Sequence, residues 1–289
     1  MGVENNIPEG WIESKLSEII ELKIDNRGRN PEYYLEEGIP VIDNFMIKGK
    51  RGIDLDTTKR YLDHTLYKTF IRTHILPGDL LITLVGNGFG NVSLAPRTKS
   101  VIIQNTIGLR TNNKSLNEFI FYNLSYKKKR ITNLDIGAAQ PSIKVSNLLN
   151  IEINLPPLPE QKAIAKVLTA FDDKIELLQA QNKTLETILK VKYAEEFIVG
   201  SCIDWPKVKI GDYVKTNSIS INKNYCHDTI LYMDTGSLTK GVAESLQELK
   251  LSEAPSRAKR LVKHNDILIS TVRPNQKHFG LIKYPISNL

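Results

Sequence analysis

The sequence predicts an α+β protein in which one long helix separates two related modules with small mixed or antiparallel sheets. Three observations support this prediction. A proline-rich stop is followed by apolar residues at heptad spacing. Short apolar runs bounded by turn residues occur on both sides of that stretch. Segments before the stretch recur after it in the same order, as expected for a duplicated module.

The long helix is predicted to begin within residues 155–161, which read Leu-Pro-Pro-Leu-Pro-Glu-Gln. The first two prolines cannot lie inside a helix, whereas Pro159 suits the first helical position. Glu160 suits the positive end of the helix dipole, and Gly200 is a natural stop. A helix over residues 159–199 would form a rod of roughly 60 Å at ~1.5 Å per residue.

Apolar residues along this helix follow a coiled-coil pattern. The predicted seam comprises Ile164, Leu168, Phe171, Ile175, Leu178, Asn182, Leu185 and Leu189. Asn182 puts a polar side chain in the seam, where such a residue often sets the register at some cost in stability. Because the seam is narrow, we expect this helix to pair with another helix.

The internal repeat rests on three pairs of segments. Residues 11–19 correspond to 205–213, residues 39–43 to 230–234, and residues 76–83 to 263–270. A duplicated module with different loop lengths explains all three. The second copy lacks a counterpart of roughly residues 100–200, so we expect it to expose strand edges and apolar surface.

The predicted boundaries follow from the repeat and the helix. They place the first module at residues 1–155, the helix at 156–200 and a truncated second module at 201–289. Within the modules, the predicted elements are strands at Leu80–Val85, Val101–Ile107 and Ile267–Val272, a helix at Asn117–Lys129, and a segment at Ser142–Leu149 packed near the long helix.

Composition and charge narrow the class of protein. The net charge is +7, and the excess of Lys and Arg lies in the two modules rather than on the helix. This fits polyanion binding and fits a mildly basic surface equally well. No apolar run approaches the roughly eighteen residues of a membrane span, and the N-terminus lacks signal-peptide features. We therefore expect no membrane association.

Cysteine and histidine usage predicts neither disulfides nor a metal site. Cys202 and Cys226 are too few for a disulfide framework and fit a reducing cytoplasm. The five histidines show no metal-ligand spacing among themselves or with the cysteines. We therefore expect a cytoplasmic protein without a bound metal.

The glycine run at residues 86–90 is the one candidate cofactor loop. It follows a predicted strand, as in S-adenosylmethionine and dinucleotide sites. No helical pattern follows it, however, and no acidic residue lies about twenty positions later. A tight turn is therefore the favoured interpretation. The chain shows no P-loop and no nucleophile elbow, so we predict no catalytic residue and no cofactor in this chain.

Polar and basic residues suited to DNA gather in both modules. Asn and Gln can read adenine, Arg can read guanine, and Lys mainly holds phosphate. The candidates in the first module are Lys48, Lys50, Arg51, Asn87, Asn91, Arg97, Lys99, Gln104 and Asn105. Those in the second are Arg257, Lys259, Arg260, Arg273, Asn275, Gln276 and Lys277. Each one, taken singly, also fits an ordinary surface residue.

Taken together, these features resemble the specificity subunit of a type I restriction-modification system. The resemblance rests on two diverged modules that each open at a Trp, on residues 139–143 (Ala-Gln-Pro-Ser-Ile), and on the proline-rich stop with its long helix. It covers essentially the whole chain. It implies a target-recognition domain at residues 1–155, a conserved helical region after it, and the start of a second recognition domain at 201–289.

The resemblance also implies a division of labour. This chain would not be an enzyme; it would bind a two-part target in double-stranded DNA and dock two modification subunits. Those subunits would bring S-adenosylmethionine for adenine methylation, and restriction subunits would bring ATP and magnesium. Family members usually carry a second helix antiparallel to the first, which this chain lacks. We therefore predict a homodimer, or pairing with a separately encoded half, through the helix at 159–199.

Two other classes of protein stay open. One is a coiled-coil adaptor whose modules bind proteins instead of DNA. The other is a stand-alone S-adenosylmethionine-dependent methyltransferase built on the glycine run.

Overall fold

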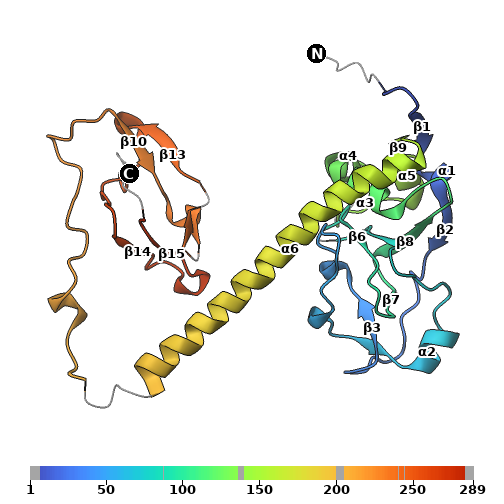
Figure 1. Cartoon of the computed structure of the whole chain (residues 1–289), viewed down its shortest axis with the longest axis horizontal. Helices are drawn as coiled ribbons and strands as arrows, with labels where there is room; N and C mark the ends of the chain where they lie inside the picture. Colours follow the sequence, from blue (N-terminus) through green and yellow to red (C-terminus); the bar gives the residue numbers. More distant parts are fainter. Residues whose placement is uncertain are drawn as a thin grey trace. The chain divides into compact units, whose positions relative to one another are not determined.

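The computed structural model describes residues 7–86, 88–135, 140–199, 205–239, 241–243 and 245–283. The chain divides into two compact units, Met1–Tyr193 and Ala194–Leu289 (Figure 1). Both units combine short helical segments with small sheets, so the predicted α+β class is confirmed.

Unit 1 contains nine strands and six α-helices among its described residues. The strands are β1 (Ile12–Lys15), β2 (Ile20–Ile24), β3 (Ile39–Ile42), β4 (Tyr61–Leu62), β5 (Leu80–Thr83), β6 (Val92–Leu94), β7 (Val101–Ile102), β8 (Thr106–Thr111) and β9 (Glu152–Leu155). The helices are α1 (Leu16–Ile19), α2 (His64–Thr69), α3 (Asn117–Tyr126), α4 (Lys128–Thr132), α5 (Val145–Leu149) and α6 (Leu158–Ala194).

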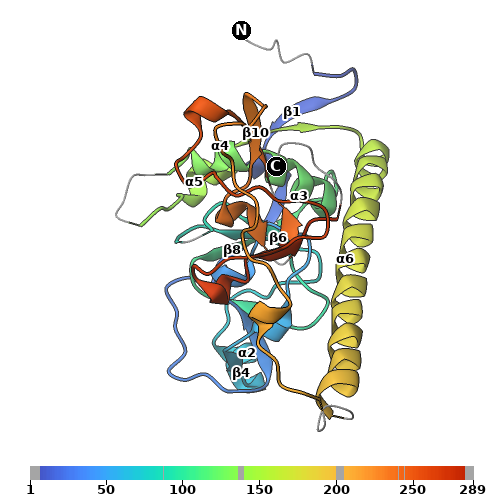
Figure 2. The ribbon, with the colours of Figure 1, turned by 90° about the vertical axis from the view of Figure 1, so that its left-hand side faces the viewer.

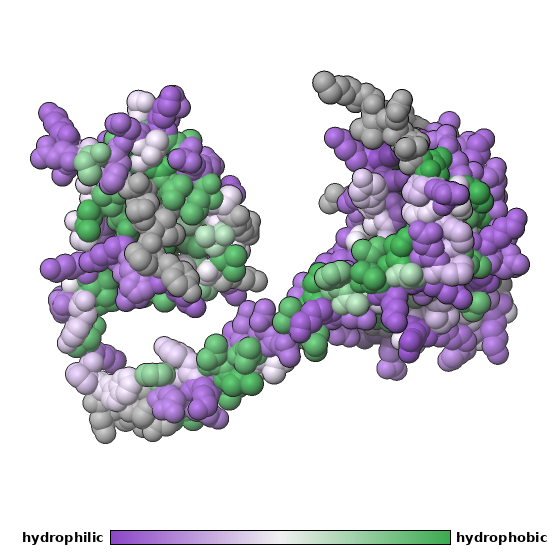
Figure 3. Space-filling view, turned by 45° about the horizontal axis from the view of Figure 1, so that its top comes forward, coloured by the Kyte–Doolittle hydropathy of each residue, from purple (hydrophilic) through white to green (hydrophobic). Residues whose placement is uncertain are grey.

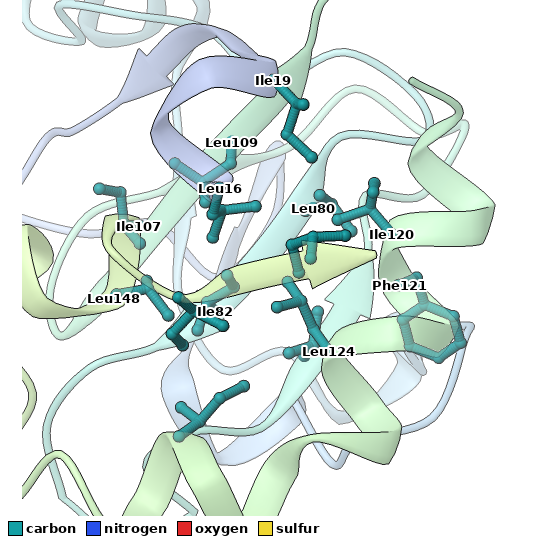
Figure 4. Packing of buried hydrophobic residues seen from close by; sticks show 14 of the residues in the cluster. Leu16, Ile19, Leu80, Ile82, Ile107, Leu109, Ile120, Phe121, Leu124 and Leu148 are labelled. Atoms are coloured by element: carbon teal, nitrogen blue, oxygen red, sulfur yellow. The ribbon is translucent and has the colours of Figure 1, made fainter. Parts of the chain in front are cut away.

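Two sheets organise unit 1 into two lobes. In the proximal lobe, α1, α3, α5 and the β1–β9 pair pack on one face of the four-stranded antiparallel sheet β2-β8-β5-β6 (Figure 4). In the distal lobe, the three-stranded sheet β4-β3-β7 packs with α2 and the loops around it. The side chains of β5 alternate between two clusters: Leu80 and Ile82 enter the proximal core, whereas Leu81 enters a cluster with Ile42 of β3 and Ile102 of β7 that joins the two sheets.

One predicted strand is divided in the structure. The run Val101–Ile107 forms β7 and the start of β8, which belong to different sheets. The break falls at Asn105, whose φ of 58° is left-handed, a conformation that Asn tolerates better than most residues. The apolar pattern predicted burial correctly but did not reveal the change of sheet.

Helix α6 is one uninterrupted helix of 37 residues (Figures 1 and 2). It continues as a π-helical segment, Glu195–Val199. The predicted stop at Gly200 lies outside the described residues. Nowhere in the described part of the chain is a helix both long and apolar enough to cross a membrane.

Unit 2 repeats part of the strand pattern of unit 1. Its strands are β10 (Thr229–Tyr232), β11 (Leu238–Thr239), β12 (Val242–Ala243), β13 (Gln247–Lys250), β14 (Ile267–Ile269) and β15 (Phe279–Leu281). The antiparallel pair β14–β15 corresponds to β5–β6, and β10–β13 corresponds to β3–β4. Unit 2 thus repeats two antiparallel strand pairs of unit 1 in the same order.

Candidate functional site

The first turns of α6 are fastened to the proximal lobe by Gln161. Its side chain is 0% exposed, its Nε2 donates to the carbonyl oxygens of Lys114 (3.0 Å) and Pro156 (2.8 Å), and its Oε1 accepts from the amide of Leu116 (2.9 Å). Because both the oxygen and the nitrogen of this buried amide form hydrogen bonds, the side chain is held in one orientation. The last residue of the proline-rich run therefore fixes the direction in which the helix leaves the domain.

Further contacts hold the next turns of α6. The Trp11 indole donates to Glu160 at 3.1 Å, and Ala165 is buried in the proximal core. The Tyr122 hydroxyl donates to Asp172 at 2.8 Å. Burial, reinforced by this carboxylate, raises the pKa of Tyr122 to about 12. Sequence reasoning missed Tyr122, because nothing near it in the chain signals a contact with the helix.

Arg51 extends this attachment to the distal lobe. Its guanidinium forms ion pairs with Asp173 and Glu176 of α6. Sequence analysis placed Arg51 among the DNA-binding candidates, but its side chain turns to the helix instead. The reason is geometric: the Arg51 carbonyl accepts from the amide of Leu94 at 2.9 Å, which holds this loop beside α6.

Beyond these contacts, α6 carries exposed apolar side chains. Of the predicted seam, Ile164 packs against the proximal core of its own unit, and Leu168 is half-buried. The remaining seam residues are exposed: Phe171, Ile175, Leu178, Asn182, Leu185 and Leu189. We call this set the free seam. Figure 3 shows hydrophobic residues gathered along the helix. An apolar stripe on a solvated helix is typical of an interaction surface.

The loop that carries Lys48, Lys50 and Arg51 lies against the glycine run at residues 86–90. Asn91 Nδ2 donates to the carbonyl of Ile47 at 2.9 Å, and Asn44 Nδ2 donates to that of Val85 at 3.2 Å. Lys48 and Lys50, at the tip of the loop, are exposed. The structure thus brings together the predicted DNA-binding residues of the loop, Lys48 and Lys50, and those that follow the glycine run. The side chain of Asn91 mainly joins these two segments by its hydrogen bond.

The glycine run itself forms the turn from β5 into β6. Gly86, Gly88 and Gly90 have φ values of 89°, 89° and 77°, which other residues rarely adopt. A Cβ at Gly90 would lie 3.2 Å from side-chain atoms of Ile131 and Thr132, so the turn also lies close under α4. The predicted tight turn is confirmed. Asn87 lies outside the described residues.

A second group of predicted DNA-binding residues, which comprises Arg97, Lys99, Gln104 and Asn105, lies beside α2. Lys99 Nζ is 4.1 Å from the ring centroid of Tyr67, and Gln104 Nε2 donates to Asn30 Oδ1. Asn105 is the left-handed residue between β7 and β8, and Arg97 is exposed. These residues border the distal lobe and face solvent at its loops.

Cation–π pairs surround the same lobe, and sequence analysis did not find them. Besides Lys99, the pairs are Arg29 over Phe70 (5.8 Å), Lys59 over Phe45 (5.9 Å) and Arg60 over Tyr34 (4.5 Å). The signal was present as Tyr and Phe interleaved with Lys and Arg between residues 27 and 72. Such a surface offers charge for phosphates and rings for contact with bases or sugars.

The cations of this lobe differ in their availability. Arg27 pairs with Asp25 at 2.6 Å, and Arg60 pairs with Asp43, so both are partly neutralised. In the described part of unit 1, Lys48, Lys50, Lys59, Arg97 and Lys99 form no ion pair, and all are exposed. We call these five the basic set of the distal lobe.

His74 is a titratable residue that lies near Lys99 in this lobe. Its ring stacks on Tyr67 with centroids 4.3 Å apart. Burial, and then the charge of Lys99, lower the pKa of His74 below its ordinary value. The imidazole is therefore neutral near pH 7, and the positive charge at this place belongs to Lys99.

The candidates of unit 2 are more scattered. Arg257 Nε donates to the Tyr232 hydroxyl at 3.0 Å. The set Arg257, Lys259, Arg260, Arg273, Asn275, Gln276 and Lys277 is exposed. Arg273 and Lys277 both have positive φ, at 50° and 57°. Among the described residues of the chain, no three His, Cys, Asp or Glu side chains group as metal ligands.

The comparisons with known proteins agree on one family. The profile described as "Type I restriction modification DNA specificity domain" matches residues 8–187, which covers the proximal lobe, the distal lobe and most of α6. This chain therefore belongs to the type I restriction-modification DNA specificity family.

Two similar proteins from Methanocaldococcus jannaschii are named as specificity subunits of type I restriction enzymes. The putative type I restriction enzyme MjaX specificity subunit is 42% identical over 113 residues, or 39% of this chain and 26% of the relative. The MjaVIII specificity subunit is 29% identical over 194 residues, or 64% of this chain and 44% of the relative. The chain thus spans less than half the length of each.

Solved structures support the fold. The type I S subunit from M. genitalium aligns with all of this chain (100%) and 72% of its own, at a TM-score of 0.58 and 15% identity. A chain from a study of assembly and conformational transition in the type I R-M system aligns with 67% of this chain and 46% of its own, at a TM-score of 0.50 and 21% identity. At these identities the likeness concerns the fold alone.

Proposed function

We propose that this chain is the DNA sequence-recognition subunit of a type I restriction-modification complex and is not itself an enzyme. The single observation that carries the proposal is the family match, which spans the lobe with the unpaired basic set and the helix docked to it. Recognition of double-stranded DNA needs cations for phosphates and polar side chains for base edges, and the distal lobe offers both.

The residues divide by role within this proposal. Lys48, Lys50 and Lys99 contact phosphates, while Arg97 and Gln104 reach base edges. Arg51 and Asn91 position the loop rather than touch DNA. The basic candidates of unit 2 would serve a second half-site, about one to two helical turns away, as expected for a two-part target.

Assembly belongs to the same proposal. Modification subunits supply S-adenosylmethionine, and restriction subunits supply ATP and magnesium, in the cytoplasm. The free seam of α6 pairs with the same helix of a second copy, or with a separately encoded half. Its apolar side chains are between 45% (Leu178) and 68% (Leu189) exposed, which supports a helical partner.

Salt-dependent DNA binding tests the recognition role. Affinity of the full chain for duplex DNA should fall steeply with salt, and Lys48→Ala with Lys50→Ala and Lys99→Ala should reduce the log–log slope by about 3, roughly one unit per phosphate contact. The matched control, Lys128→Ala with Lys129→Ala and Lys144→Ala, removes three exposed lysines outside the distal lobe and should leave the slope unchanged. A salt-insensitive chain, or equal effects of both variants, would favour the protein-binding adaptor.

Sedimentation tests the assembly role. Phe171→Asp with Leu178→Asp in the free seam should yield a monomer, since two carboxylates would enter an apolar interface. The control pair Ala180→Asp with Thr187→Asp adds the same charge on the opposite side of the heptad and should leave the mass unchanged. An unchanged mass for the seam variant would exclude pairing through this surface.

A further inference from the structure

Residues 140–143 pair in antiparallel fashion with the backbone at residues 84–86, where β5 leads into the glycine run. The amide of Ile143 donates to the carbonyl oxygen of Leu84 at 2.9 Å. The side chain of Ile143 is 3% exposed and belongs to the proximal core. This segment is thus anchored by its backbone and by a core side chain, which fixes the point from which the Gln140 side chain projects.

Gly86 leaves the space that the Gln140 side chain occupies. A Cβ at Gly86 would lie 3.0 Å from Gln140 Nε2 and 3.4 Å from Asn44 Nδ2. A larger residue at this position would therefore push against both groups. Two carboxamides from distant parts of the chain thus lie over one glycine at the start of the glycine run.

The two carboxamides differ in their availability. Asn44 is half-buried, and its Nδ2 donates to the carbonyl oxygen of Val85 at 3.2 Å. Gln140 is exposed, and its carboxamide forms no hydrogen bond with the part of the chain that the structure describes. Its oxygen can therefore accept and its amino group can donate to a ligand at the same time.

Positive charge lies close to this pair of carboxamides. Asn44 begins the loop that carries the exposed Lys48 and Lys50 of the basic set. The bond from Asn91 Nδ2 to the carbonyl of Ile47 holds that loop against the glycine run. Lysines that hold phosphates position a protein on a duplex, and polar side chains beside them then reach the base edges.

We propose that Gln140 is a specificity-determining residue that reads one adenine through the major groove. Its oxygen accepts from the N6 amino group of adenine while its amino group donates to N7, a pair of contacts that only adenine offers there. Because the backbone of residues 140–143 is already fixed, little conformational freedom is lost on binding. The inference rests on the DNA recognition proposed above and adds a residue outside the candidates found in the sequence.

Selection of bound sequences from a random duplex library by the full chain tests the proposal. Gln140→Ala should lower the preference for adenine at one position of the motif by about tenfold, the size expected when one bidentate contact is lost. The other positions of the motif and the salt dependence of binding should not change. The matched control is Gln179→Ala, at an exposed glutamine of α6, which should leave the whole motif unchanged.

A change of chemistry at the same side chain separates base reading from a structural role. The carboxylate of Gln140→Glu accepts but does not donate, and it matches the N4 amino group of cytosine. This variant should therefore replace adenine by cytosine at the position that Gln140→Ala affects. Because the side chain is exposed, wild type and both variants should unfold at the same urea concentration.

The outcomes distinguish this inference from the proposed function. An unchanged motif in Gln140→Ala would overturn the role of Gln140 and leave DNA recognition intact. An even loss of preference at all positions, together with unfolding at lower urea, would overturn it as well, because it would show a structural role. A wild-type pool that stays random would contradict DNA sequence recognition itself, and the role of Gln140 with it.

Discussion

Leu80 and Ile267 occupy the same place in two copies of one hairpin, yet the first is fully buried and the second is 71% exposed. The turns before them form the same hydrogen bonds. What differs is the strand and helix that follow in unit 1, β8 and α3. The hairpin is thus specified by its own residues, whereas its burial depends on a segment elsewhere in the chain.

The largest effect should come from the ion pair that only unit 1 possesses. Arg110→Ala leaves the Asp79 carboxylate buried without its partner, which should destabilise unit 1 by about 3 kcal/mol or more. Asp266→Ala in unit 2 removes a turn hydrogen bond and should cost at most about 1.5 kcal/mol. Urea unfolding measures both. Equal losses would mean that the two aspartates do not differ in their surroundings.

A matched truncation gives the next largest effect. Leu80→Ala opens a cavity in the proximal core and should cost about 2–5 kcal/mol. Ile267→Ala removes a side chain that faces solvent and should change the free energy of unfolding by less than about 0.5 kcal/mol. A large loss from Ile267→Ala would show that β14 is already covered.

The docked first turns of α6 and its exposed part offer a similar contrast. Gln161→Ala removes three hydrogen bonds from a buried site and should cost about 1–3 kcal/mol, loosening the first turns of the helix. Asn182→Ala, on the exposed part, should cost less than about 0.5 kcal/mol in the monomer. Amide exchange across residues 158–165 reports this directly: it should accelerate in the first variant and stay unchanged in the second.

The smallest effect concerns Tyr122. Its pKa of about 12 exceeds the ordinary value near 10, so the contribution of the protonated phenol to stability is complete below pH 10 and is lost as the pH rises through 12. Tyr122→Phe should cost about 1 kcal/mol near neutral pH and remove this loss at high pH. Phenolate absorbance should show a tyrosine that titrates near pH 12 and is missing in the variant.

The elements that depend on local sequence patterns were predicted from the sequence. The proline-rich stop, the heptad helix, the β5 strand and the repeated turn all depend on neighbouring residues. The partners of Gln161 and Arg51 could not be predicted, because those contacts join residues far apart in the chain. For the same reason Ile164, which fits the seam by spacing, proved to face its own domain core.

The candidate site shows the same division. Exposed lysines such as Lys48 and Lys50 were identified from composition and turn signals, and their binding role stays a prediction. The pairing of Lys99 with Tyr67 required the fold, since the loop before β7 and helix α2 meet only in three dimensions. A sequence shows which residues are charged, but it does not show which of them form ion pairs with carboxylates far away in the chain.

Methylation sequencing of DNA exposed to this chain together with the proposed modification subunit tests which unit takes part in the proposed recognition. Among the described residues, β5 in unit 1 is paired on both edges, whereas β14 in unit 2 is paired on one. We therefore expect Lys48→Ala with Lys50→Ala to reduce modification throughout. Arg273→Ala with Lys277→Ala should have a smaller effect. The reverse order would make unit 2 the main reader.

Selection of bound sequences from a random duplex library by the full chain tests the central claim most directly. If the distal lobe of unit 1 recognises DNA sequence, the bound pool should converge on a defined motif. The variant lacking Lys48, Lys50 and Lys99 should retain little DNA at the same salt concentration. A pool that stays random, or a motif equally enriched by that variant, would contradict the claim.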